Sequence, residues 1–190
     1  MRPRLNSIAT MLAVLGGLAY PFLVWTALGT VAPWYFVLFG IVCLLVRAVV
    51  LHRVHARRME IGALLLAVLL LAALATLSAE LATRAYPVVV SLAVAAMFAL
   101  SLRTPPSVVE RIARIREPDF PPDGVRYTRQ VTQVWVGFLL LNAMISAATA
   151  LWGSLDAWVL WNGLLSYLTM GVLFAAEYGV RHHRRHAMPR

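Results

Sequence analysis

Hydrophobic positions in this chain run in six long apolar segments instead of alternating with polar positions. The segments are Ile8–Leu28, Val31–Leu51, Ile61–Ala79, Tyr86–Leu102, Val131–Trp152 and Ala157–Val180. A helix needs about 20 apolar residues to cross the hydrocarbon of a bilayer. The pattern predicts an all-α, polytopic membrane bundle of about six transmembrane helices in three hairpins. The fourth segment is short, and the sequence leaves open whether it crosses fully.

The composition of the chain agrees with this interpretation. Of its 190 residues, 61% are hydrophobic and 13% are charged. A soluble domain carries about one quarter charged residues. We therefore expect a single integral membrane domain over residues 1–190.

The arginines are distributed unevenly between the connecting segments. All 17 basic residues are arginines, and all except Arg47 and Arg84 gather in every second connection. The arginine-rich segments are the N-terminus with Arg2 and Arg4, then 53–58, 103–129 and the tail from Arg181. Because cytoplasmic loops collect arginine, both termini are expected on the cytoplasmic side. An aromatic belt is expected at the opposite boundary, from Trp34, Tyr35, Tyr86, Trp152 and Trp158.

The formal net charge of +9 has two interpretations. In a soluble protein it would favour nucleic-acid binding, whereas in a membrane protein it follows from arginine-rich cytoplasmic loops. We favour the second, and expect membrane lipids and other proteins as partners, with no nucleic acid. The absence of lysine is a compositional hint of a GC-rich bacterial genome. For a bacterial chain with these spans and arginine-rich loops, the predicted location is the inner membrane.

The longest polar segment is the predicted cytoplasmic loop 103–129. Its prolines end the preceding helix, and Ser107 and Glu110 have the spacing of a capping box, which predicts a helix from Val108. Ile112 and Ile115 share the apolar face of that helix. The loop is either a connector on the lipid surface or a docking site for a partner. The candidate docking residues are Ser107, Glu110, Arg111, Arg114, Glu117, Asp119 and Asp123.

The last two spans carry matching polar stripes. Both read N-x-x-x-S-x-x-T, which places the three polar side chains of each span on one helical face. The stripes are Asn142, Ser146 and Thr149 in the fifth span, and Asn162, Ser166 and Thr169 in the sixth. Because a tight turn joins the spans, the stripes are expected to meet. They serve either as hydrogen-bonded contacts between helices or as a polar groove for a ligand.

Two charges fall inside the predicted spans, Arg47 and Glu177. A charge at this depth is costly unless it pairs or reaches the surface. We expect the two residues to pair between the second and sixth spans, as a structural contact or as a proton or substrate site. Near the opposite boundary, the spacing of Glu80 and Arg84 predicts a salt bridge within one helix.

The usual motifs of catalysis, metal binding and cofactor binding are weak or missing in the sequence. We assign no catalytic residue, no metal site and no cofactor. The expected role is therefore non-enzymatic.

Several segments carry a resemblance to known families. They are 105–111, Glu117-Pro118, Pro121-Pro122 and 132–138 with Asn142. In these the chain resembles an uncharacterised family of bacterial inner-membrane proteins, often encoded beside fatty-acid-synthase-like and aryl-polyene pigment genes. More distantly, it resembles the intracellular septation protein A family. The resemblance implies a scaffold or assembly factor in the biogenesis of the cell envelope or of a lipid-like product. The alternative is a carrier or flippase for an acyl lipid or polyene.

Overall fold

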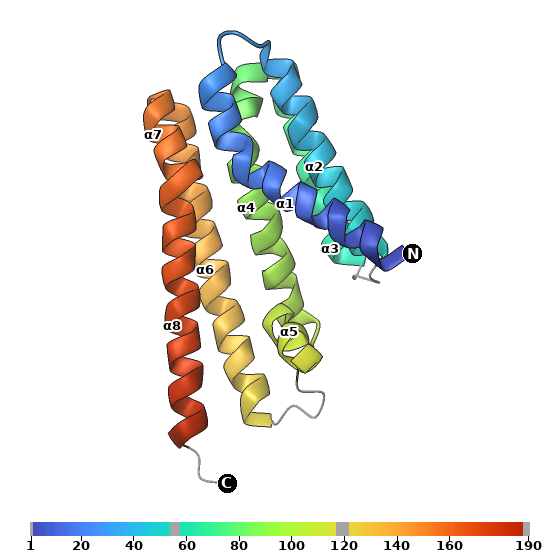
Figure 1. Ribbon diagram of the computed structural model, residues 1–190, viewed down its shortest axis with the longest axis vertical. Coiled ribbons are helices and arrows are strands. Elements are labelled where there is room, and N and C mark those ends of the chain that lie inside the picture. The colour runs from blue at the N-terminus through green and yellow to red at the C-terminus, as the bar shows by residue number, and fades with distance from the viewer. Residues whose placement is uncertain (1, 54–57, 117–121, 188–190) are drawn as a thin grey trace.

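The computed structural model describes residues 2–53, 58–116 and 122–187 of the chain, which form helices joined by short turns. In chain order the elements are α1 (Arg2–Ala27), α2 (Pro33–Arg53), α3 (Arg58–Leu77), α4 (Ala79–Arg103), α5 (Val108–Arg116), α6 (Pro122–Trp152), α7 (Leu155–Val159), the π-helical segment η1 (Leu160–Leu165) and α8 (Ser166–Ala187). The predicted all-α helical bundle is confirmed (Figure 1).

Among the residues that the structure describes, five helical stretches are long and apolar enough to cross a membrane. They are Pro33–His52, Arg58–Leu77, Ala79–Arg103, Pro122–Trp152 and Leu155–Arg181. Within α1, Leu15–Ala27 forms a shorter apolar helix. The chain is therefore a membrane protein with five candidate spans, and the crossing by α1 stays a prediction.

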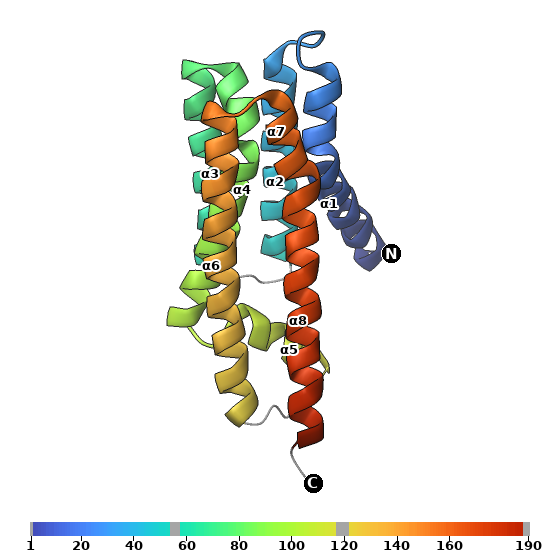
Figure 2. The ribbon, with the colours of Figure 1, turned by 90° about the vertical axis from the view of Figure 1, so that its left-hand side faces the viewer.

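The bundle has two different ends (Figure 1). The short-loop end consists of the turns at 28–32, Ser78 and 153–154. The arginine-rich end carries α5, the start of α6 and the end of α8, and α6 and α8 reach further there than α2 and α3 do (Figure 2). At 31 residues, α6 is about 46 Å long, against a hydrocarbon thickness of about 30 Å.

The central helix is α4, which lies against α2, α3 and α6. It is longer than the predicted segment Tyr86–Leu102, because Ser78 caps its start by accepting a hydrogen bond from the Leu81 amide. Pro87 lies inside α4 and lacks the N–H that would bond the Thr83 carbonyl. The Tyr20 hydroxyl of α1 donates to that carbonyl at 2.9 Å, so a neighbouring helix replaces the missing bond. The short fourth segment is thus a full-length helix.

The core between α1, α2 and α4 is built around two tyrosines. The rings of Tyr20 and Tyr86 lie 4.2 Å apart, and both side chains are buried. Tyr86 packs on Gly40 of α2 so closely that a Cβ there would lie 2.7 Å from its ring. Glycine at position 40 therefore lets α2 and α4 approach each other.

Proline also shapes α1. Pro21 lies inside this helix and leaves the Gly17 carbonyl without its usual intrahelical donor. Figure 1 shows α1 bending, so that its N-terminal part runs obliquely away from α4 and α8. The bend is the expected result of a proline in a helix interior.

Candidate functional site

A buried polar cluster joins α4, α6 and η1. The Ser146 hydroxyl donates to Asn162 Oδ1 at 2.7 Å, and Asn162 Nδ2 contacts Thr149 Oγ1 at 3.5 Å and the Trp158 carbonyl at 2.9 Å. Asn142 instead donates to Ser91 Oγ of α4 at 3.0 Å. Most polar atoms of this cluster bond each other, so it holds three segments together.

The remaining members of the two stripes do not reach across the interface. Ser166 and Thr169 donate to carbonyls of their own helix, and Thr169 is exposed. The structure thus brings together three of the six stripe residues, Ser146, Thr149 and Asn162, whereas Asn142 contacts Ser91 of α4. Ser91 is the partner that the sequence analysis missed, because a single serine in an apolar span carries no spacing signal.

We predict that Asn162→Ala lowers the free energy of unfolding by about 1–2 kcal/mol. The side chain makes three hydrogen bonds, and each such bond in a membrane contributes about 0.6–2 kcal/mol. The total is smaller than their sum, because the unfolded chain forms other hydrogen bonds in their place. Detergent unfolding followed by circular dichroism measures the change. Thr169→Ala is the matched control, expected to cost little. Equal losses for both variants would contradict the role of Asn162.

Arg84 fixes the short-loop end of the bundle. Its guanidinium donates to the carbonyls of Thr149 and Gly153 at 3.2 and 2.7 Å, where α6 ends. A cation suits the carbonyls at a helix C-terminus. The Arg84 carbonyl in turn accepts from Trp158 Nε1 at 2.9 Å. The predicted salt bridge with Glu80 is therefore replaced by contacts to α6.

Three charged residues of the candidate docking loop form ion pairs within the protein. Arg111 forms an ion pair with the buried Glu60 of α3. Arg114 pairs with the buried Glu110 at 2.7 Å within α5. Ser107 is buried as well and accepts the Glu110 amide at 3.3 Å, as the capping box predicts.

The candidate docking residues differ in what they contact, and their docking role stays a prediction. Arg111 attaches α5 to α3, whereas Glu110 pairs with Arg114 inside α5 and Ser107 caps its start. Ile112 and Ile115 face outward and are 61% and 81% exposed. Asp123 is exposed at the start of α6. Glu117 and Asp119 lie outside the described residues.

The two predicted intramembrane charges have separate surroundings. Glu177 pairs with Arg181, one turn along α8, at 3.0 Å, instead of with Arg47. Helical i,i+4 spacing makes this local pair easy to form, whereas Arg47 would have to reach across from α2. Among the described residues, Arg47 has neither a hydrogen bond nor an ion pair.

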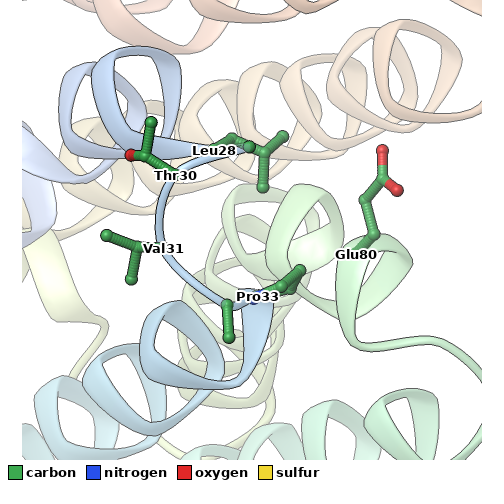
Figure 3. Close-up of a pocket in the computed structure, with 7 residues that line it drawn as sticks. Leu28, Thr30, Val31, Pro33 and Glu80 are labelled. Carbon is green, nitrogen blue, oxygen red and sulfur yellow. The ribbon is translucent and has the colours of Figure 1, made fainter.

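A pocket of about 380 Å³ lies at the short-loop end (Figure 3). It is lined by residues 28–33 and Glu80. Figure 3 shows the Glu80 carboxylate extending away from Pro33. The pocket is open and has one charged lining residue, whereas ligand sites are concave with several converging polar groups. It is shaped by the α1–α2 turn and includes none of the predicted site residues.

Comparison with models of protein families, with curated proteins and with solved structures gives no match for this chain. The resemblance to the two bacterial families therefore stays a prediction.

Proposed function

We propose that this protein is a non-enzymatic scaffold or assembly factor of the bacterial inner membrane, acting in the biogenesis of the cell envelope or of a lipid-like product. The arginine-rich end would face the cytoplasm, with both termini there, because cytoplasmic segments collect arginine. The resemblance to the two bacterial families supports the same assignment.

The observation that carries the proposal is the orientation of α5. An ion pair from the partly exposed Arg111 to the buried Glu60 attaches this nine-residue helix to α3, while Ile112 and Ile115 remain largely exposed. The helix is thus held by this ion pair and by packing of the buried Ala113 side against α6 and α4, and it offers Ile112 and Ile115 to a partner. An apolar face rimmed by charges is a surface for a protein partner or for the headgroup region of the bilayer.

We predict that Ile112→Ser combined with Ile115→Ser abolishes association with a partner protein. A bound partner would cover both isoleucines, and their loss would weaken binding by about 2 kcal/mol or more, which is about 30-fold in affinity. The tagged full chain is extracted in mild detergent, and the copurified proteins and lipids are quantified by mass spectrometry. The expected result is a stoichiometric protein partner with the wild type that is lost in the double variant.

The matched control replaces two exposed valines of α8, Val172→Ser and Val180→Ser. This variant should retain the partner. A partner that stays bound to the α5 variant would overturn the docking role of α5. A specific lipid with no protein partner would instead favour the second candidate.

The second candidate is a carrier or flippase for an acyl lipid or polyene product. The observation in its favour is Arg47, a charge inside a candidate span whose pairing with Glu177 is replaced by the local pair in α8. Against it, the pocket at the short-loop end does not reach Arg47. The scaffold is therefore the better supported function.

A further inference from the structure

Arg47 lies deep within α2. It is fourteen residues after Pro33 and six before Arg53, so its Cα is about 21 Å from the short-loop end of a helix about 30 Å long. The side chain of an arginine within about two turns of a helix end usually extends toward the membrane surface at that end. The surface nearest to Arg47 is the arginine-rich end.

The side chain of Arg47 extends in the opposite direction. A Cβ at Gly17 would lie 2.7 Å from its Nη2 atom, which places the guanidinium beside Gly17. Gly17 is ten residues before the end of α1, or about 15 Å from the short-loop end. The charge therefore lies near the middle of the span. This direction follows from helix geometry, because side chains tilt toward the N-terminus and α2 begins at the short-loop end.

In the part of the chain that the structure describes, the guanidinium lies near tyrosines and the Cys43 thiol and is not paired with a carboxylate. The Tyr86 hydroxyl lies beside the same point, 4.0 Å from the Cβ position at Gly17, and Tyr167 of α8 interacts electrostatically with Arg47. Tyr86 is buried, and its hydroxyl has no oxygen or nitrogen partner among the described residues. The hydroxyl does contact the Cys43 thiol, which is a weak hydrogen-bond partner, so an arginine and a hydroxyl without a strong partner converge at one place.

The described carboxylates are all placed elsewhere. Glu60, Glu110 and Glu177 pair with Arg111, Arg114 and Arg181, Glu80 and Asp156 lie at the short-loop end, and Asp123 begins α6. A cation at the centre of a bilayer is costly unless an opposite charge accompanies it. The side chain is partly exposed, so an external anion has access to it.

We propose that Arg47 and Tyr86 bind the anionic headgroup of an amphiphile, a carboxylate or a phosphate that carries an apolar tail. The depth of the guanidinium selects an amphiphile over a soluble anion, because the surrounding hydrocarbon solvates the tail and excludes free ions. Arginine supplies a charged fork that matches either headgroup, and the tyrosine hydroxyl donates one further hydrogen bond. This inference does not depend on the scaffold role of α5.

The test is a titration of the purified full chain in a nonionic detergent. The probes are oleate and dioleoylphosphatidylglycerol, with dioleoylphosphatidylcholine and inorganic phosphate as controls. We expect oleate, phosphatidylglycerol or both to bind and to raise the unfolding temperature. Their relative affinities distinguish a carboxylate from a lipid phosphate. Binding of inorganic phosphate with equal affinity would overturn the assignment to an amphiphile.

Arg47→Met should weaken binding about tenfold or more, since it removes a charged hydrogen-bonding partner. Without ligand, the same variant should unfold at the same temperature as the wild type or higher, because it removes an uncompensated charge. Arg126→Met, which removes an exposed arginine of α6, is the matched control and should bind normally. Unchanged affinity in Arg47→Met would overturn the proposal.

A structural role for Arg47 gives the opposite result. If the guanidinium instead donates a hydrogen bond to the Gly17 carbonyl left free by Pro21, Arg47→Met lowers the unfolding temperature of the ligand-free protein. The affinity for the amphiphile then stays unchanged. Gly17→Ala keeps the charge but displaces the guanidinium, and should weaken binding several-fold, whereas Gly171→Ala, with open space around it, should not. If Arg47→Met fails to fold, Gly17→Ala and Tyr86→Phe decide the question, since wild-type affinity in both would overturn the proposal.

Discussion

Arg111→Met is expected to release α5 from the bundle and to lower the free energy of unfolding by about 3 kcal/mol. The reason is its partner. The Glu60 side chain is 5% exposed, so without Arg111 a carboxylate would remain buried and unpaired. Loss of one partner of a buried pair costs more than the pair contributes. Hydrogen exchange of the α5 amides should rise to the rate of an isolated nine-residue helix, because such short helices are not stable alone.

A double variant separates the charge from the packing. Arg111→Met combined with Glu60→Gln removes the buried charge and should recover more than half of the lost free energy. Arg181→Met is the matched control, because its pair with Glu177 lies within one helix and contributes about 0.5 kcal/mol or less. If the double variant is as unstable as Arg111→Met alone, the stabilisation comes from packing and not from the ion pair.

The contact between Arg111 and Glu60 also shows where sequence periodicity stops being informative. The spacing of Ser107 and Glu110 predicts the start of α5 correctly, and the spacing of Ile112 and Ile115 predicts one apolar face. Periodicity does not say which face meets the protein. That depends on Glu60, 51 residues away, which in the sequence follows a run of arginines and looks like part of a surface loop.

The spans themselves are predictable because hydrocarbon thickness sets the length of an apolar helix. The difficult case was α4, where the sequence places Glu80, Arg84 and Pro87 at the expected boundary. Each of these would normally argue against a membrane helix. Arg84 is used on the carbonyls at the end of α6, and the carbonyl freed by Pro87 accepts from Tyr20. Both groups of contacts join different helices, so no local sequence pattern predicts them.

Aromatic residues near the short-loop end divide into two groups that composition cannot separate. Trp34, Tyr35 and Trp152 are 52%, 67% and 81% exposed, as expected for a belt at a membrane boundary. Tyr86 and Trp158, predicted to belong to the same belt, are buried in the core. For Trp158 the cause is the π-helical segment that follows α7, beside α1 and α6, together with the Arg84 carbonyl that receives its indole N–H.

This difference leads to the prediction with the largest effect. Trp158→Ala should lower the free energy of unfolding by about 3–5 kcal/mol, because it empties a fully enclosed site among α1, α4 and α6. Trp158→Phe should cost less, with about 1 kcal/mol for the lost hydrogen bond to Arg84. Unfolding in detergent, followed by circular dichroism, measures both.

Trp152→Ala is the matched control, since it removes the same side chain from the other side of the α6–α7 turn. At 81% exposure it should change stability by about 0.5 kcal/mol or less. Similar losses at the two positions would mean that both tryptophans act through the membrane boundary, and the closed contact of Trp158 with α4 would be wrong. A large loss of stability in Trp158→Ala alone would mean that the buried Trp158 side chain, and not the membrane boundary, fixes the α6–α7 turn. In that case Arg84 connects α4 to both sides of the α6–α7 turn, because its carbonyl accepts from the indole of Trp158 and its guanidinium binds the carbonyls that end α6.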